Sequence, residues 1–305
     1  MVAKPVVLIW GCDPQRQLEA AWIRSLLAGL KVQESIGIPL GFAAEGSIVL
    51  VESGLLRLER NPSHDRLLQL RCQRARRLEA LAGCGGLVLI HLSDEEGLDG
   101  DELYPMLPTG TRVWRNFPYA RFSHRSVMVR SFPIGPRAEF LDDAFCLPAH
   151  QRPYPWAFMG TIWGGGSRAL ATALFLRALP NGMFFGGRSF GVGLPLMQYQ
   201  AILAQSALAL CPEGDRHLDT FRLYESLQTG CVPLIVNFRN QAEMLLGPDS
   251  PVPTFSYWQE ALDFAQTFLG DARALDDLQQ QVRLWWQGRR REIADGMIRD
   301  LQSFV

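Results

Sequence analysis

The sequence predicts an α/β fold in which two Rossmann-like domains face a central cleft. Short apolar runs alternate with longer amphipathic stretches, which is typical of parallel sheets covered by helices. A proline-rich stretch from about Pro133 to Pro155 interrupts this alternation, because proline removes backbone donors and breaks helices and strands. The alternation then resumes, so we place an N-terminal domain at residues 1–150 and a C-terminal domain at 151–305. A chain of 305 residues is long enough for two such domains.

The elements of the N-terminal domain follow from short runs of aliphatic and β-branched residues. A helix is predicted between the second and third strands, where Ser63 can cap its start and Gly83 can end it. The predicted strands are Val6–Trp10, Ile48–Glu52, Leu87–Leu92, Arg112–Asn116 and Ser126–Arg130.

The C-terminal domain repeats this order of strands and helices. Ligands of parallel α/β sheets bind beyond the carboxyl ends of the strands, so two facing domains predict a cleft lined by those ends. A long final helix, at about 271–304, is a candidate to return toward the first domain. The other predicted helices lie at about 167–179, 195–205 and 220–230, and the predicted strands are Trp156–Gly160, Met183–Gly187, Ala207–Pro212 and Val232–Val236.

Composition indicates a globular protein and argues against nucleic acid as a partner. Hydrophobic residues make up 48% and charged residues 20%, and the net charge of −1 gives no overall field that attracts nucleic acid. The six cysteines lack Cys-x-x-Cys spacing, which favours free thiols in a reducing compartment. The apolar run Val6–Trp10 is too short for a signal peptide, and no stretch reaches the ~20 apolar residues of a membrane span. We therefore expect a cytoplasmic protein, with peripheral membrane contact left open.

The most informative segment runs from Ala207 to Val236 and predicts a strand, a loop, a helix and another strand. Asp219 or Thr220 can cap the helix. Arg222 lies in its first turn, where the helix dipole favours an anion and a guanidinium suits a diphosphate. One turn further, the Glu225 carboxylate can accept hydrogen bonds from ribose hydroxyls. The alternative is that this arginine and glutamate are an ordinary solvated pair on a helix surface.

The same segment carries Pro212, Gly214, Arg222, Leu223, Glu225, Gly230, Cys231 and Pro233. In these residues it resembles the exostosin-like glycosyltransferase family. The shorter sequences HLSDE, RNFPY and FPIG in the first half are similar to its ribitol-xylosyltransferase branch. The resemblance implies a GT-B fold, a nucleotide-sugar donor with UDP as the expected nucleotide, inversion at the sugar, and no obligatory metal or other cofactor. Glu213 stands where the family commonly carries arginine.

A glycine-rich turn follows the first predicted strand of the C-terminal domain. Gly160 and Thr161 end that strand, and Arg168 enters the first turn of the next helix. Glycines let backbone N–H groups approach a phosphate, so the turn is a second candidate for donor binding. The alternative is a flexible turn with Ser167 as an ordinary helix cap. Arg188, after the strand Met183–Gly187, is a third basic candidate.

A polar loop follows the apolar strand Leu87–Leu92. Transfer to a hydroxyl needs a base, and we predict Asp94 for this role, with Glu95 as the second choice. The alternative is an acidic loop that caps the next helix. His91, Arg115 and Asn116 also lie at strand ends and are the candidate acceptor-binding residues, or they only position and cap these loops.

Together these observations predict an enzyme of glycan or polysaccharide biosynthesis, a hexosyl- or pentosyltransferase that moves a sugar from a nucleotide to an acceptor hydroxyl. Two alternatives share the fold: a sugar-nucleotide epimerase, and a noncatalytic nucleotide-sugar-binding protein. The sequence does not name the sugar or the acceptor.

Overall fold

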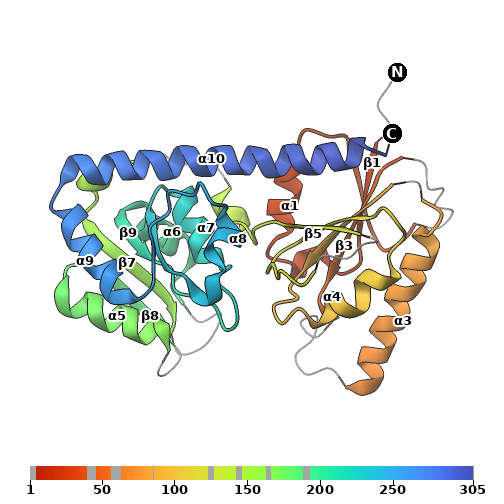
Figure 1. Ribbon diagram of the computed structural model, residues 1–305, viewed down its shortest axis with the longest axis horizontal. Coiled ribbons are helices and arrows are strands. Elements are labelled where there is room, and N and C mark those ends of the chain that lie inside the picture. Colours follow the sequence, from red (N-terminus) through yellow and green to blue (C-terminus); the bar gives the residue numbers. More distant parts are fainter. Residues whose placement is uncertain are drawn as a thin grey trace. The chain divides into compact units, whose positions relative to one another are not determined.

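The computed structural model contains two α/β units (Figure 1). It describes residues 5–39, 46–55, 63–84, 86–122, 127–141, 146–162, 166–187 and 193–304. The first unit comprises residues 1–134 and 290–305, and the second comprises residues 135–289. Among the described residues, no helix is both long and apolar enough to cross a membrane.

The first unit is built on a parallel sheet with the strand order β2-β1-β3-β4-β5-β6 in the described part of the chain. The central strands β3 and β4 are buried along their whole length, as expected for strands covered on both faces. The sequence analysis missed β2, because VQESI is a half-exposed strand without an apolar run. The strands are β1 (Val6–Trp10), β2 (Val32–Ile36), β3 (Ile48–Ser53), β4 (Leu87–Leu92), β5 (Arg112–Arg115) and β6 (Met128–Ser131).

Helices cover this sheet with amphipathic faces. Leu78 of α3 (His64–Leu81) and Leu103 of α4 (Leu98–Leu103) pack into one apolar cluster with Leu50 and Leu89 of the central strands. The predicted cap of α3 is confirmed, because the Ser63 hydroxyl accepts a hydrogen bond from the Arg66 amide at 3.2 Å. The unit also contains the short helix α1 (Ala20–Leu26) and the 3₁₀ turns Pro14–Arg16 and Tyr104–Met106.

The last helix, α10 (Ala272–Gln302), contributes residues to both units. Its final part is anchored in the first unit. The indole of Trp114 donates to Asp300 at 2.9 Å, and the Ser47 hydroxyl donates to the carbonyl of Leu301 at 2.7 Å. The residues after position 289 therefore belong with the N-terminal sheet rather than with the C-terminal one.

The second unit has a parallel sheet with the order β11-β10-β9-β7-β8 in the described residues. All four strands predicted for this domain are present. The short β11 and the two helices before α10 were missed in the sequence. The strands are β7 (Tyr154–Thr161), β8 (Met183–Gly187), β9 (Ser206–Leu210), β10 (Val232–Val236) and β11 (Thr254–Phe255), and the helices are α5 (Ser167–Ala178), α6 (Leu196–Ala204), α7 (Phe221–Gln228), α8 (Ala242–Leu246), α9 (Trp258–Leu269) and the first part of α10.

The boundary between the units falls at residue 134, ahead of the predicted position at 150. The proline-rich connector packs onto the second unit, which accounts for this difference. Phe140 stacks edge-on against Tyr199, and the guanidinium of Arg152 donates to the carbonyls of Ser206 and Thr229. These contacts bind the connector to the C-terminal sheet and its helices.

Each sheet contains a point at which the strand order reverses. In the first unit β1 lies between β2 and β3, and in the second β7 lies between β8 and β9. Loops leave such a strand and its neighbour in opposite directions, which opens a crevice beyond their carboxyl ends where α/β proteins bind ligands. The first sheet therefore has its crevice between β1 and β3, and the second between β7 and β9.

Candidate functional site

Arg222 lies at the crevice of the second unit. It stands in the first turn of α7, which follows β9, and its Nε donates to the carbonyl of Met159 on β7 at 3.2 Å. The guanidinium lies over the ring of Phe158, with its carbon 4.5 Å from the ring centroid. A Cβ at Gly160 would overlap its Nη2 atom, so glycine is needed for this close approach. One residue thus joins the ends of β7 and β9 across the point where the strand order reverses.

Two buried polar atoms at this crevice have no hydrogen-bond partner among the described residues. They are Nη1 of Arg222 and Oγ1 of Thr220, the residue at the N-cap of α7. Neither predicted capping side chain caps this helix, since Asp219 accepts a hydrogen bond from the Tyr224 hydroxyl instead. A buried donor without a partner costs about 1–3 kcal/mol. The two atoms belong to residues two positions apart at a helix N-terminus, where backbone N–H groups and the helix dipole favour an anion.

Arg168 stabilises the turn that follows β9 through hydrogen bonds to backbone carbonyls. Its guanidinium donates to the carbonyl of Glu213 at 3.1 Å and to that of Thr161 at 3.0 Å. Gly214 closes the same turn by donating to the carbonyl of His217 at 2.7 Å. Pro212, at the end of this strand, leads into the turn. Arg168 therefore ties the end of β7 to the loop after β9, and that loop carries Thr220 and Arg222.

Glu225, one turn after Arg222, lies inside the second unit with 1% of its surface exposed. One carboxylate oxygen accepts a hydrogen bond from Arg137 Nε, and the other accepts one from the Tyr199 hydroxyl at 2.8 Å. Burial and this carboxylate raise the pKa of Tyr199 well above its ordinary value, so its hydroxyl keeps its proton and donates it. A ribose would find a carboxylate that already accepts two hydrogen bonds, and its binding by Glu225 stays a prediction.

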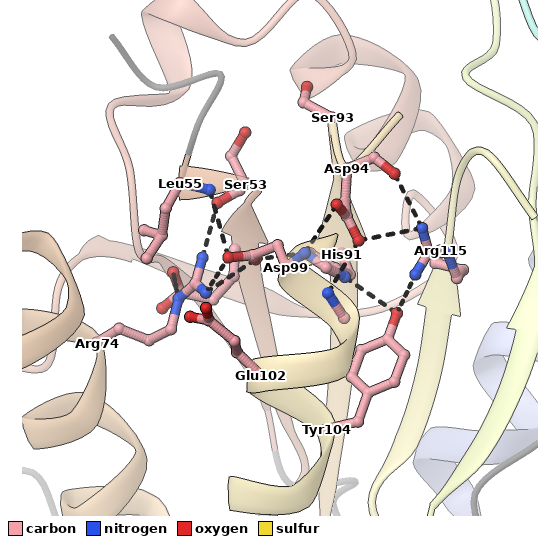
Figure 2. Close-up of polar contacts among 12 residues, drawn as sticks. Ser53, Leu55, Arg74, His91, Ser93, Asp94, Asp99, Glu102, Tyr104 and Arg115 are labelled. Carbon is pink, nitrogen blue, oxygen red and sulfur yellow. Dashed lines mark hydrogen bonds and ion pairs between the residues drawn. The ribbon is translucent and has the colours of Figure 1, made fainter. Parts of the chain in front are cut away.

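In the first unit, Asp94 caps a helix. One of its oxygens accepts from the Asp99 amide at 3.0 Å, and the other from the Gly100 amide at 2.9 Å, both in the first turn of α4. The guanidinium of Arg115 donates to the same carboxylate at 3.3 Å (Figure 2). The side chain is 4% exposed. This geometry agrees with the helix-capping alternative for the acidic loop.

Asp94 belongs to a buried chain of polar groups, shown in Figure 2. Arg115 donates to the Tyr104 hydroxyl at 3.0 Å, and that hydroxyl lies 3.0 Å from Nδ1 of His91. Nε2 of His91 is 2.9 Å from Asp99, whose carboxylate accepts two bonds of 2.8 Å from Arg74. A neutral imidazole that accepts from the tyrosine and donates to the aspartate satisfies every group in this chain.

The pKa directions in this chain follow from burial and charge. Burial lowers the pKa of His91, against the opposing effect of Asp99, so the imidazole is neutral near pH 7. Burial alone would raise the pKa of the Asp99 carboxyl, but the hydrogen bond from His91 and the charge of Arg74 hold it below its usual range. His91 and Arg115 are both buried. Their burial agrees with the alternative that these residues position the loops.

Asn116 and Glu95 lie at the carboxyl edge of the same sheet. The Asn116 carbonyl oxygen accepts from the Ser93 amide at 3.0 Å, and its NH₂ group donates to Glu19 at 3.4 Å. Glu95 is half-buried, and its backbone carbonyl accepts from the Tyr119 hydroxyl. Glu19 was not singled out in the sequence, where it appears as one polar residue at the start of an apolar helix.

His91 should make the stability of the first unit depend on pH. An unfolded histidine has a pKa of about 6.5, and the folded value is lower, so below this pH the unfolded state binds more protons. We expect the free energy of unfolding to fall from pH 6.5 downward by up to about 1.4 kcal/mol per pH unit. The depressed pKa of Asp99 adds a further loss below about pH 4.

Urea unfolding of the wild type and of His91→Gln between pH 5 and 8 measures this effect. Glutamine keeps a donor and an acceptor but does not titrate, so the slope below pH 6.5 should flatten in the variant. An equal slope in both proteins would contradict the role given to His91.

Comparison with known proteins identifies the second unit. Residues 139–245 match the model of the RXYLT1 C-terminal domain. Ribitol-5-phosphate xylosyltransferase 1 of Danio rerio is 28% identical over 150 residues, which cover 48% of this chain and 30% of the relative. Residues 139–245 are an RXYLT1 C-terminal domain. The chain is a distant homologue of that exostosin-like enzyme, and the match spans less than a third of the relative's length.

Solved structures show the same fold. A DNA-modifying β-glucosyltransferase, solved with and without uridine diphosphoglucose, has a TM-score of 0.54 at 11% identity and covers 98% of this chain and 100% of its own. The N-terminal domain of Candida albicans trehalose-6-phosphate phosphatase has a TM-score of 0.54 at 10% identity, with coverage of 99% and 97%. At this identity the likeness concerns the fold alone. The predicted GT-B fold with two parallel α/β sheets is confirmed.

All of the predicted donor residues fall within residues 139–245, the segment that matches the RXYLT1 C-terminal domain. The structure brings Gly160 and Arg222 into contact, and Arg168 joins Thr161 to the Pro212–Gly214 turn. Arg188 lies outside the described residues. Arg137 and Tyr199, which hold Glu225, were not predicted from the sequence.

Proposed function

We propose that this chain is an inverting glycosyltransferase that takes a sugar from a UDP-linked donor and passes it to an acceptor hydroxyl. The observation that carries the proposal is the pair of buried, unpartnered atoms at the start of α7, Thr220 Oγ1 and Arg222 Nη1. In the proposed complex, the guanidinium and the N-terminus of α7 bind the diphosphate.

The homology supports the choice of reaction. The predicted donor residues lie in an RXYLT1 C-terminal domain, and the Danio rerio relative is named as a xylosyltransferase acting on ribitol-5-phosphate. We therefore propose UDP-xylose as the first donor to test. The N-terminal unit would bind the acceptor, as the sequence analysis expects.

The bound diphosphate would be held by groups that are already in place. Phe158 and the carbonyl of Met159 fix Arg222, and Arg168 fixes the loop before it, so little ordering is required on binding. The leaving UDP would gain the same contacts as negative charge develops on it, which favours the transition state over the bound donor.

Calorimetric titration with UDP, UMP, UDP-xylose, UDP-glucose and NAD⁺ tests this proposal. We expect UDP and a UDP-sugar to bind, UMP to bind more weakly because it lacks the second phosphate, and NAD⁺ not to bind. At ligand concentrations of about 100 times the dissociation constant, the fold should gain about 2.7 kcal/mol in stability. A protein that binds none of these nucleotides would contradict the proposal. Binding without any release of UDP would identify a noncatalytic binding protein.

A further inference from the structure

We propose that Arg137 is a second guanidinium of the donor site, which binds the diphosphate together with Arg222, and that Glu225 holds it in position. This inference rests on the proposed function and deepens it. Arg137 lies in the proline-rich connector, after the sequence FPIG and Pro136. It belongs to the second unit, as do Arg222 and Glu225, so all the groups in this proposal lie in one unit.

The guanidinium of Arg137 is held in place by three side chains. Its Nε donates to one carboxylate oxygen of Glu225. Its carbon lies 5.4 Å from the ring centroid of Tyr199 and 5.8 Å from that of Phe140, within the ~6 Å range of cation–π contacts. Tyr199 belongs to α6, which packs against α7, the helix of Glu225 (Figure 1). Little side-chain ordering is therefore required when a ligand binds.

The outer edge of this guanidinium is available to a ligand. Among the described residues, its Nε is the atom that hydrogen-bonds to protein, and the side chain is 30% exposed. The Nη1 and Nη2 atoms remain as a pair of donors, which matches the oxygens of a phosphate. The Glu225 side chain is 1% exposed, and its other oxygen accepts from the Tyr199 hydroxyl at 2.8 Å. The ion pair thus presents its positive end, rather than its carboxylate, to the solvent.

Arg222 is built in the same way. Its Nε donates to the carbonyl of Met159, its guanidinium packs on Phe158, and its Nη1 atom is buried without a partner in the described part of the chain. In both arginines the protein uses Nε and an aromatic ring to fix the guanidinium. Arg152, in the same connector, is different, because both of its Nη atoms donate to backbone carbonyls. Arg137 follows the pattern of Arg222 and not that of a structural arginine.

The two guanidiniums lie close to the same face of α7. Arg222 and Glu225 are three residues apart on this helix, so their side chains are neighbours. The charges of Arg222 and Arg137 both act on the Tyr199 hydroxyl, which donates to Glu225. Burial opposes the charged form of Arg137, but the hydrogen bond and charge of Glu225 raise its pKa above the ordinary value, so it stays charged. Two positive charges and one negative charge leave an excess that favours a diphosphate.

The test compares the UDP affinity of Glu225→Gln with that of the double variant Arg137→Met, Glu225→Gln by calorimetry. Neither protein buries this carboxylate without its cation, and the Tyr199 hydroxyl can still donate to the glutamine oxygen. The two proteins therefore differ only in the guanidinium. We expect the double variant to bind UDP about 10- to 150-fold more weakly, the range for a hydrogen bond to a charged group. Added NaCl should weaken UDP binding less in the double variant, because one charged contact is missing.

Two further variants complete the design. Arg177→Met, at an exposed arginine in the last turn of α5, should keep the wild-type affinity and salt dependence. Adding Glu225→Gln to Arg137→Met should not weaken UDP binding further, because a carboxylate without its arginine has nothing to position. This comparison separates the positioning role of Glu225 from direct binding of the ribose.

Each outcome supports or overturns a defined statement. If the wild type binds UDP but Glu225→Gln and the double variant share one affinity and one salt dependence, Arg137 only ties the connector to α7, and the transferase proposal stands. If Glu225→Gln causes a further loss in the Arg137→Met background, Glu225 contacts the nucleotide itself and its positioning role is wrong. A wild type that binds no UDP would overturn both proposals.

Discussion

Replacing Arg74 with methionine is expected to lower the free energy of unfolding of the first unit by about 3–5 kcal/mol, the cost of removing one partner from a buried ion pair. Arg74 donates to Asp99 and to the carbonyl of Ser53, and it forms an ion pair with Glu52 at 3.4 Å. Methionine fills much of the same volume, so the loss reports the buried Asp99 carboxylate left without its arginine rather than a cavity. Urea unfolding measures the loss in the free energy of unfolding. Hydrogen exchange of the β3 and β4 amides assigns this loss to the first unit.

Arg71→Met is the matched control on the same helix. Arg71 makes two hydrogen bonds to Glu102, but the two side chains are 44% and 54% exposed. Such surface pairs contribute about 0–1 kcal/mol. Equal losses in the two variants would mean that the buried network around Arg74 has no special importance for the fold.

Replacing Arg222 with methionine is expected to weaken UDP binding by about 1.5–3 kcal/mol, the range for a hydrogen bond to a charged group. This corresponds to a loss of affinity of about 10- to 150-fold. The folded state should change little in stability, because methionine can still pack on Phe158 and the variant no longer buries an unpartnered Nη1 atom. Calorimetric titration with UDP gives the affinity, and urea unfolding gives the stability.

Two threonine variants at the ends of α7 sharpen this test. Thr220→Val removes a buried hydroxyl without a partner, so it should weaken UDP binding while the free protein keeps or gains stability. Thr229→Val removes a hydroxyl that donates to the Glu225 carbonyl at 2.9 Å, so it should lower stability and leave UDP affinity unchanged. If both variants shift stability and affinity together, the unpartnered atoms are not a ligand site.

Local signals in the sequence were sufficient for most of the architecture. Fully buried strands such as β3 and β4 are continuous apolar runs, and Ser63 marks the start of α3. The helix of Arg222 and Glu225 was also placed correctly, since its motif is local. Strand β2 was missed because an exposed edge strand carries no such run.

The sequence by itself determined two α/β domains and the helix on which we propose a donor site, because strands, helices and a motif within thirty residues are set by neighbouring residues. Only the tertiary structure decided what each polar side chain does. Asp94 and Glu19 are both acidic residues after a strand, yet Asp94 meets the amides of α4 while Glu19 crosses two strand ends to reach Asn116. Such partners are distant in the sequence: Glu19 and Asn116 are 97 positions apart, and Trp114 and Asp300 are 186 apart. Their meeting depends on strand order, which no local pattern encodes.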